Sequence, residues 1–300
     1  MIGCDLGSNT LRIVQIDCQT QKRVLAYEKI VRTAKDLHVN KRIAQSSIEN
    51  IFQALKEASL LFDFKHEKCF CVTTEAMRVA QNAEEILRDI DETFGLKFNI
   101  ISGEKEAYLT SLAIENALKR EGLEHKTYVL FDLGGGSTEI TFAKDGEKKS
   151  QSFPFGIVNI AEQYKENIAQ KVTQIVSSIE PFISQESEIP KKYLQLVATA
   201  GTPTTVASFL QGIDYAHYDY EKVNGTILYV EDFDEAFQRL TKLDEEEAER
   251  YTGTNRRDLV VVGILIVKAI MERLGFHSCV VMDDGLREGV AISNCNNIVH

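Results

Sequence analysis

The sequence lacks the features that mark a nucleic-acid binder, a membrane protein or a secreted protein. Its net charge is −11, whereas nucleic-acid binding normally needs a basic face, so a polyanionic substrate would need a local basic cluster. The longest apolar run, from Leu259 to Val267, contains a glycine and is too short to span a bilayer, so we expect a buried helix there. The chain opens with a strand-like run rather than a basic region and a cleavage site. We therefore expect a cytoplasmic protein that binds neither membrane nor nucleic acid.

Metal-binding patterns of histidine and cysteine are missing as well. The six histidines form no HxxxH or HxH motif. Cys69 and Cys71 would share one face of a strand, but no second pair with zinc spacing accompanies them. We therefore expect buried thiols in a reducing compartment. The cysteines concerned are Cys4, Cys18, Cys69, Cys71, Cys279 and Cys295.

One pattern occurs twice: strand, Asp-x-Gly turn, strand. The first copy is Asp5-Leu6-Gly7-Ser8-Asn9-Thr10, and the second is Asp132-Leu133-Gly134-Gly135-Gly136-Ser137-Thr138-Glu139. Glycines permit positive φ and close approach, so successive N–H groups can form a concavity that suits phosphate. A single Gly-rich hairpin is commonly a structural turn. Two copies about half a chain apart favour a duplicated scaffold with a phosphate site between its halves.

Length and the order of elements indicate an α/β protein of two domains. A chain of 300 residues with 44% hydrophobic content can bury more than one core. The polar stretch from Arg120 to Lys126 directly precedes the second turn and is the best boundary, giving domains 1–120 and 121–300. The C-terminal helix, about residues 286–300, is a candidate to pack back onto the first domain. Strands interleaved with helices in both halves indicate the α/β class.

Several helix starts carry capping signals. A capping box at Ser46–Glu49 predicts a helix start, and Asn82 predicts another for a helix that ends near Gly95. Thr202 is the expected N-cap of a helix that follows a Gly turn and ends at Gly212. This turn and open helix end would suit an anion, although a capped structural helix would have the same pattern.

Glu106 is the first candidate for a catalytic group. It lies in the first turn of a helix that begins near Ser102, where the helix dipole favours the ionised carboxylate that accepts a proton from water. The alternative is that Glu104 and Glu106 simply complement the dipole, and this segment alone favours that alternative. The position of Glu106 relative to the two turns favours catalysis.

Carboxylates and arginines near the turns provide candidates for metal and phosphate. Asp5, Asp132 and Glu139 offer the oxygen ligands that Mg²⁺ prefers, although an exposed strand residue is the ordinary role for Glu139. Arg12 and Arg78 are candidate phosphate clamps, with ordinary surface arginines as the alternative. The full phosphate-binding set is Gly7, Ser8, Asn9, Thr10, Arg12, Gly134, Gly135, Gly136, Ser137, Gly201 and Thr202.

These segments together resemble the exopolyphosphatase and guanosine pentaphosphate phosphohydrolase family (Ppx/GppA) of the actin, Hsp70 and sugar-kinase superfamily. The resemblance implies two actin-like (ribonuclease H-like) domains with the active site in the cleft between them. It also implies that Glu106 is the catalytic base, that Arg78 contacts phosphate, and that Asp132 and Glu139 serve the metal site. The matching segments are Asp5–Thr10, Ala76–Arg78, Ser102–Ala107, Asp132–Glu139, Thr199–Thr205 and Asp283–Gly289.

The resemblance implies a phosphohydrolase that uses Mg²⁺ or another divalent cation. Its expected reaction releases orthophosphate from inorganic polyphosphate, converts guanosine pentaphosphate to the tetraphosphate, or both. The chain ends at His300 without the C-terminal helical domain of long members, so we expect the short form, which favours short polyphosphate or guanosine pentaphosphate. The segment Val31–Asp36 lacks the glycines usual in the family, which leaves the shape of that loop open. A homodimer is also left open.

Two rival functions use the same turns. A small-molecule kinase of the superfamily would bind ATP there and would need an acceptor and an aspartate base. A non-enzymatic actin-like protein would bind nucleotide and assemble without steady phosphate release. Phosphorylation of an acceptor would reveal the first, and light scattering combined with a phosphate assay would reveal the second.

Overall fold

The protein, described by a computed structural model over residues 1–164, 166–186 and 189–296, divides into two compact units. Unit 1 comprises Met1–Ile114 and Asp284–His300, and unit 2 comprises Glu115–Asp283. The division falls inside helix α5 (Gly103–Arg120), a few residues before the polar stretch chosen from the sequence. The segment from Asp284 onward belongs to unit 1.

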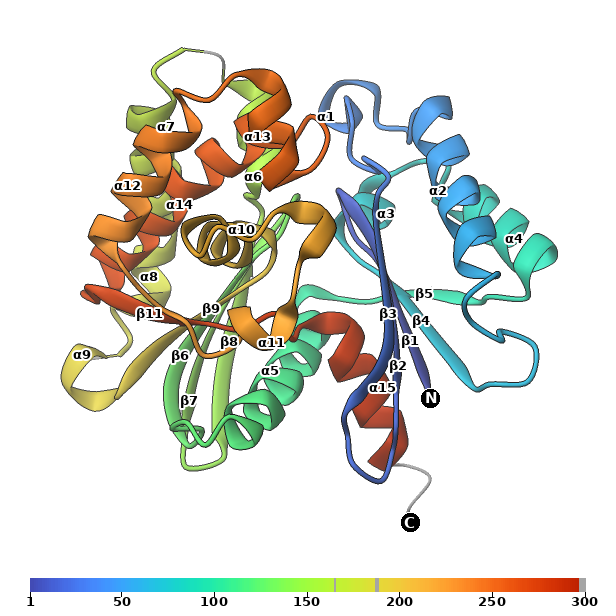
Figure 1. Cartoon of the computed structure of the whole chain (residues 1–300), viewed down its shortest axis with the longest axis horizontal. Helices are drawn as coiled ribbons and strands as arrows, with labels where there is room; N and C mark the ends of the chain where they lie inside the picture. The colour runs from blue at the N-terminus through green and yellow to red at the C-terminus, as the bar shows by residue number, and fades with distance from the viewer. Residues whose placement is uncertain (165, 187–188, 297–300) are drawn as a thin grey trace. The chain divides into compact units, whose positions relative to one another are not determined.

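Unit 1 contains a five-stranded sheet in the order β3-β2-β1-β4-β5 (Figure 1). The first three strands form an antiparallel meander, and β4 and β5 continue the sheet in parallel with β1. Its strands are β1 (Ile2–Leu6), β2 (Thr10–Ile16), β3 (Arg23–Ile30), β4 (Cys69–Thr73) and β5 (Phe98–Ile100). Besides the part of α5 up to Ile114, its helices are α1 (Leu37–Asn40), α2 (Gln45–Ala58), α3 (Glu75–Val79), α4 (Ala83–Phe94) and α15 (Leu286–Asn296).

Helix α15 covers one face of this sheet, and α2 and α4 lie on the other side (Figure 1). Successive residues of a strand point to opposite faces of the sheet, so Val14 and Ile16 of β2, which are two residues apart, share a face. Both pack against Ala291 and Ile292 of α15 in one buried cluster. Burial of these apolar side chains fixes α15 on β1 and β2.

Unit 2 contains a six-stranded sheet in the order β10-β11-β9-β6-β7-β8. Read from β8 to β11, it repeats the order of unit 1: an antiparallel meander followed by two parallel strands. The repetition supports the duplicated scaffold predicted from the two turns. Its strands are β6 (Thr127–Leu133), β7 (Thr138–Lys144), β8 (Glu147–Phe153), β9 (Gln195–Thr199), β10 (Ile227–Tyr229) and β11 (Ser278–Val281).

The helices of unit 2 share one large apolar core with its sheet. The buried helix predicted around Leu259–Val267 is confirmed as part of α14. Within the described residues, none of the helices is long and apolar enough to span a bilayer. They are α6 (Ile157–Gln163), α7 (Ile168–Val176), η1 (Ser177–Ile179), α8 (Glu180–Ile183), α9 (Ile189–Lys192), α10 (Gly201–Leu210), η2 (Tyr215–His217), α11 (Tyr220–Val223), α12 (Val230–Leu240), α13 (Glu245–Thr252) and α14 (Arg257–Leu274).

The predicted capping box at Ser46–Glu49 is wrong, and the predicted cap at Asn82 is correct in position but not in its hydrogen bond. Helix α2 begins at Gln45 with Ala44 as its N-cap, so Ser46 lies inside the helix, and the Ser47 hydroxyl donates to the carbonyl of Arg32 at 2.7 Å. Asn82 is the N-cap residue of α4, as predicted, but its side chain makes no capping bond: it accepts from the Ile43 N–H (2.9 Å) and donates to the Ile43 carbonyl (3.1 Å). Both side chains bond backbone that is distant in sequence, which a local capping pattern cannot reveal.

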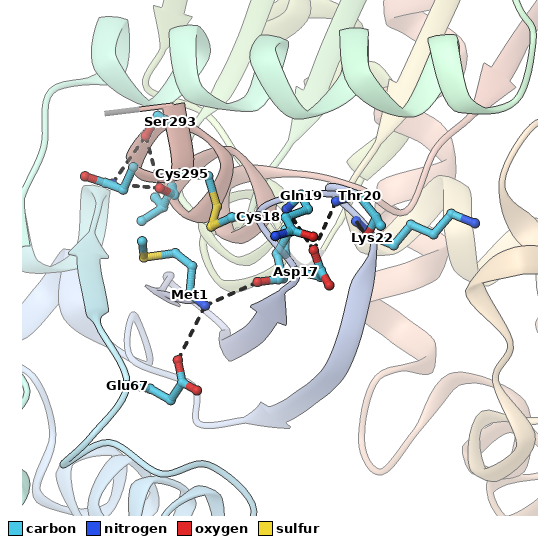
Figure 2. Close-up of a disulfide and its surroundings, with 12 residues drawn as sticks. Met1, Asp17, Cys18, Gln19, Thr20, Lys22, Glu67, Ser293 and Cys295 are labelled. Atoms are coloured by element: carbon cyan, nitrogen blue, oxygen red, sulfur yellow. Dashed lines mark hydrogen bonds and ion pairs between the residues drawn. A yellow bond between two sulfur atoms is a disulfide. The ribbon is translucent and has the colours of Figure 1, made fainter. Parts of the chain in front are cut away.

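The expectation that all six cysteines are thiols is wrong for two of them. Cys18, in the turn between β2 and β3, forms a disulfide with Cys295 in the last turn of α15, 277 residues away (Figure 2). Their Cα atoms are 5.3 Å apart. The turn is itself ordered by Asp17, whose carboxylate accepts from the N–H groups of Gln19 and Thr20. The disulfide thus ties α15 to the β2–β3 hairpin.

The remaining four cysteines are free thiols, as expected; Cys4, Cys71 and Cys279 are buried, whereas Cys69 is only partly buried. The hydrogen bond to Cys71 and burial raise the pKa of Cys4 well above its usual value. Burial raises the pKa of Cys69 and of Cys279 to about 12. Because metals bind the thiolate, protonated thiols of this kind are poor ligands.

We expect reduction of the Cys18–Cys295 disulfide to lower the free energy of unfolding by about 2–4 kcal/mol, because the cross-link restricts the unfolded chain. Urea denaturation with and without a dithiol reductant measures the difference. The Cys18→Ser variant is the control, because its denaturation midpoint should not respond to the reductant. Six titratable thiols in the denatured, unreduced protein would contradict the disulfide.

Candidate functional site

The first turn is held from behind by the loop that follows β3. The N–H groups of Val31 and Arg32 donate to the Asn9 carbonyl, both at 2.9 Å, and that of Ala34 donates to the Ser8 carbonyl at 2.7 Å. In a planar trans peptide the N–H points opposite to the C=O. The amides of Asn9 and Thr10 share these peptide planes and therefore point away from the loop.

The shape of this loop, left open by its lack of glycine, depends on two left-handed residues. Arg32 has φ 55° and Asp36 has φ 53°, values that favour glycine. Side chains in this region are uncommon and cost free energy, of order 1–3 kcal/mol each, unless neighbouring contacts hold them. The Ser47 hydroxyl, which donates to the Arg32 carbonyl, is one such contact.

Asp5 and Arg12 face each other across the first turn. They are direct partners in the β1–β2 pairing, and Arg12 is in turn the partner of Glu28 on β3. Residues opposite each other in a sheet point to the same face, so the three charges form one row. Arg12 Nε donates to Glu28 Oε2 at 3.0 Å. Arg12 is therefore an ion-paired side chain of the sheet, and its role as a phosphate clamp stays a prediction.

The two acids at the start of α5 differ in environment. Glu104 is exposed, whereas Glu106 is only 8% exposed. Ser102 directly precedes the helix, and its hydroxyl accepts from the Lys105 N–H at 3.2 Å. Glu106 Oε2 lies 3.4 Å from Nη1 of Arg78. A buried carboxylate beside a guanidinium is more than a surface charge that complements the helix dipole.

Arg78 links α3 to the start of α5. Its Nε and Nη2 donate to Glu75 Oε2 (3.1 and 2.9 Å), and its Nη1 donates to the Ile101 carbonyl at 2.5 Å and to Glu106 at 3.4 Å. The guanidinium therefore orients Glu106. A phosphate oxygen would compete for these donors.

The second turn is held from behind by the start of α6. The Gly134 carbonyl accepts from the Ile157 N–H at 3.0 Å and the Gly135 carbonyl from the Val158 N–H at 2.9 Å. The Gly136 carbonyl accepts from the Asn159 side-chain amide at 2.8 Å. The amides on the same three peptides point the other way. Successive amides directed to one side form an anion-binding concavity.

Gly156 permits this approach of α6 to the turn. A Cβ at position 156 would lie 2.5 Å from the carbonyl carbon and oxygen of Gly135 and 2.6 Å from the Gly136 nitrogen. These contacts are with backbone, which cannot rotate away. The position therefore requires glycine.

Asp132 and Glu139 face each other across the second turn. They are direct partners in the β6–β7 pairing, so both carboxylates lie on one face of the sheet. Glu139 is only 3% exposed, and its Oε1 accepts from the Ser152 hydroxyl of β8 at 2.6 Å. Paired carboxylates of this kind suit a divalent cation that takes its remaining ligands from water or phosphate. Among the described residues, no group of three or more His, Cys, Asp or Glu side chains is assembled as a complete metal site.

The third glycine turn leads into α10. The helix begins at Gly201, and Ala200, not Thr202, is the N-cap, so the predicted cap is wrong. Thr202 is 1% exposed and lies in the first turn of the helix. Ala200 has φ 75°, an uncommon conformation for alanine. Gly212 follows the helix with φ 73°, in keeping with the predicted helix end.

Comparison with known proteins decides the family. The Ppx/GppA phosphatase family profile matches residues 12–298. The chain belongs to this family. A solved Ppx/GppA protein of Aquifex aeolicus is 29% identical and has a TM-score of 0.75, and the similarity covers 100% of this chain and 98% of that one. The chain therefore has the two-domain actin-like α/β fold that the sequence predicted.

Two more distant relatives are informative in different ways. An exopolyphosphatase structure from Cytophaga hutchinsonii has a TM-score of 0.83 at 21% identity over 98% of this chain and 97% of that one, which supports the fold. A bifunctional 3-dehydroquinate synthase/phosphatase of Fusobacterium nucleatum is 23% identical over 98% of this chain. This chain spans 46% of that protein, so it corresponds to part of a longer polypeptide there.

Sequence reasoning about this Ppx/GppA chain missed the residues that support the two turns. Glu28, on β3, bonds Arg12, and Ser152, on β8, bonds Glu139, but neither third strand was identified from the sequence. Segment 147–153 is almost wholly polar, so hydrophobic alternation is nearly absent from it. Gly156 and Asn159 carry no motif either, although a lone glycine after a strand is a weak signal of close backbone approach.

We expect Gly156→Ala to destabilise unit 2 by about 1–3 kcal/mol, because the added methyl group overpacks the second turn. Thermal unfolding measures the loss. Gly7→Ala is the matched control: its added Cβ would find its nearest atom, the Thr10 carbonyl oxygen, at 3.4 Å, so the cost should be smaller. Equal melting temperatures for Gly156→Ala and the unsubstituted protein would contradict the close approach of α6.

Proposed function

We propose that this Ppx/GppA chain hydrolyses a terminal phosphoanhydride bond. The products are orthophosphate and a chain shortened by one phosphate. The substrates are inorganic polyphosphate, guanosine pentaphosphate, which is converted to the tetraphosphate, or both. The observation that carries the proposal is the buried Glu106 carboxylate beside Arg78 at the start of α5. Family membership supports the reaction class.

Glu106 acts as the general base. The attacking water gives its proton to a Glu106 oxygen as the water oxygen forms a bond to the terminal phosphorus. The bond from that phosphorus to its bridging oxygen breaks, and the electron pair leaves with the shortened chain. The Arg78 contact at 3.4 Å orients the carboxylate for this transfer.

The glycine turns bind the phosphate. The amides of the second turn point away from α6, and those of Asn9 and Thr10 point away from the loop that follows β3. Donors that are fixed before the substrate arrives need no reorganisation as charge develops on phosphate oxygens. Positioning and electrostatics supply most of the rate in phosphoryl transfer.

Asp132 and Glu139, together with Asp5, would hold Mg²⁺ or another divalent cation, which supplies neutralisation of phosphate charge. The donor chemistry fits, because Asp132 and Glu139 are paired acids on one face of β6 and β7. Asp5 faces the cation Arg12 rather than a second acid. The pair in unit 2 therefore has the greater need of a cation.

A polyanionic substrate is supported by the basic loop that backs the first turn. Lys35, Lys41 and Arg42 are exposed, and among the described residues none of them has an acidic partner. The loop is bound to the first turn at Ser8 and Asn9, and Gln81 donates to the Lys41 carbonyl at 2.9 Å. In a protein with a net charge of −11, this is the local basic cluster that an anionic chain would need.

We expect Glu106→Gln to lower phosphate release by about 10²–10⁴-fold, because the amide cannot accept the proton from water. Release is measured side by side on inorganic tripolyphosphate, long polyphosphate and guanosine pentaphosphate, without ATP. The relative rates identify the preferred substrate. Glu104→Gln is the matched control, since Glu104 is exposed two residues away, and it should keep full activity.

Retained activity of Glu106→Gln on all three substrates would show that the base is wrongly assigned. A requirement for ATP and an acceptor in the unsubstituted protein would instead identify a kinase. ATP-dependent light scattering without phosphate release would identify an assembly protein.

We expect Asp132→Asn and Glu139→Gln each to raise the Mg²⁺ concentration for half-maximal activity by about tenfold or more, since each removes a charged ligand. A Mg²⁺ titration after removal of divalent ions with a chelator measures the change. Asp145→Asn, in the exposed turn between β7 and β8, is the control and should have no effect. Activity that persists unchanged in excess chelator would exclude the metal role.

A further inference from the structure

Six alternating charges extend from the first turn into helix α15. The row Asp5, Arg12 and Glu28 crosses β1, β2 and β3 on one face of the sheet. Arg287 and Glu288 of α15 continue it, and it returns to the sheet at Arg23, the first residue of β3. Three acids and three bases alternate, so every neighbour is of opposite sign.

Glu28 stands between two arginines. Its Oε2 accepts from Arg12 Nε at 3.0 Å and lies 3.6 Å from Arg287 Nη1. Burial and the nearby Arg287 both act to lower the pKa of Arg12, but the Glu28 and Asp5 carboxylates together raise it above its usual value. Without the Glu28 charge, Arg12 and Arg287 would be neighbouring cations in a largely buried setting.

Glu288 fixes Arg287 in turn. Glu288 is 1% exposed; its Oε1 accepts from Arg287 Nε at 2.7 Å and pairs with Arg23 Nη2 at 2.8 Å. Its Oε2 accepts from the Gly285 N–H at 2.9 Å, at the start of α15. A carboxylate that uses both oxygens in this way holds the Arg287 guanidinium in one orientation.

Helix α15 is fixed at both ends on the strands that carry the row. At its start, Gly3 of β1 allows close approach, since a Cβ there would lie 2.2 Å from the Arg287 carbonyl oxygen. At its last turn, the disulfide joins Cys295 to Cys18 in the β2–β3 turn (Figure 2). The position of Arg287 relative to Glu28 is thus set by backbone packing and by a covalent bond.

Arg12 keeps donors for a ligand. Its side chain is 25% exposed. Among the described residues, its hydrogen bond to another side chain is made through Nε. The two terminal nitrogens, the end-on pair that binds phosphate oxygens, remain for a ligand.

We propose that Glu28, Arg287 and Glu288 are positioning residues that hold Arg12 in the orientation in which it binds substrate phosphate. The proposal rests on the proposed function, because it takes Arg12 as a phosphate clamp. Glu28 contacts Arg12 directly, whereas Arg287 and Glu288 act through Glu28. None of the three touches the substrate.

The test measures binding of inorganic tripolyphosphate by isothermal titration calorimetry, together with KM and kcat for phosphate release. We expect Glu28→Gln to weaken binding and raise KM by about tenfold, the effect of losing one charge-assisted contact, with kcat changed by less than about threefold. Arg12→Ala should weaken binding at least as much. In the double variant Glu28→Gln/Arg12→Ala the effects should not add, because both changes remove the same contact.

The net charge of the protein alone would predict the opposite effect of Glu28→Gln on tripolyphosphate binding. Glu28→Gln removes a negative charge from an acidic protein, which by itself would tighten binding of a polyanion. Glu57→Gln is the matched control: Glu57 pairs with Lys29, the neighbour of Glu28 on β3, and the substitution removes the same charge. We expect its affinity for tripolyphosphate to be unchanged or slightly higher.

Glu288→Gln and Arg287→Met extend the test beyond direct contact. Both should weaken tripolyphosphate binding. Adding Arg287→Met to Glu28→Gln should not weaken binding further, because the second substitution removes the cation that repels Arg12. Far-UV circular dichroism confirms that each variant is folded. A role in stability alone would lower the melting temperature and leave the dissociation constant unchanged.

Three results would overturn the proposal: unchanged binding in folded Glu28→Gln, unchanged binding in Arg12→Ala, or additive effects in the double variant. Loss of activity in Glu106→Gln alongside any of these would leave the proposed function intact. Full activity in Glu106→Gln with weakened binding in Glu28→Gln would overturn the assignment of the base and support the positioning role.

Discussion

Antiparallel pairing across the two Asp-x-Gly turns is the constraint on which both proposed phosphate sites depend. The register places Asp5 opposite Arg12 in unit 1 and Asp132 opposite Glu139 in unit 2. The same backbone thus presents an acid with a base in one copy and two acids in the other. Like charges that face each other repel, so the two acids of the second copy favour a cation more than the acid and base of the first copy do. The two hairpins therefore differ in charge because Arg12 stands opposite the aspartate in the first and Glu139 stands opposite it in the second.

The third strand of each meander supplies the residue that holds this second-strand side chain. Glu28 accepts from Arg12, and Ser152 donates to Glu139, so each second-strand residue is held by its neighbour on the third strand. Each partner suits the side chain that it orients: the Glu28 carboxylate pairs with the Arg12 guanidinium, and the Ser152 hydroxyl bonds the Glu139 carboxylate. A hydroxyl leaves the carboxylate its charge, which a cation requires, whereas a lysine at position 152 would neutralise it.

The sequence predicted those parts of the protein that rest on local patterns. Strands such as Cys69–Thr73, the helix end at Gly95 and the start of α5 near Ser102 follow from alternation, glycine and capping chemistry. The prediction of capping hydrogen bonds failed where a side chain bonds backbone that is distant in sequence, as Ser47 and Asn82 do. The Cys18–Cys295 disulfide was not predicted for the same reason, because a pairing of cysteines 277 residues apart has no local sequence pattern. The candidate residues at the turns were predicted, but the residues that orient them were not.

Support from behind explains how a turn can offer its amides to an anion. A free Gly-rich turn samples many conformations, and ordering it on binding would cost entropy. Here the carbonyls of Ser8 and Asn9 are engaged by the loop after β3, and those of the second turn by the start of α6. Each engaged carbonyl fixes its peptide plane and so aims the amide on the other side. The left-handed conformations at Arg32 and Asp36 and the absence of a side chain at Gly156 follow from the same need, since each lets the supporting segment come close enough to fix the turn before a ligand binds.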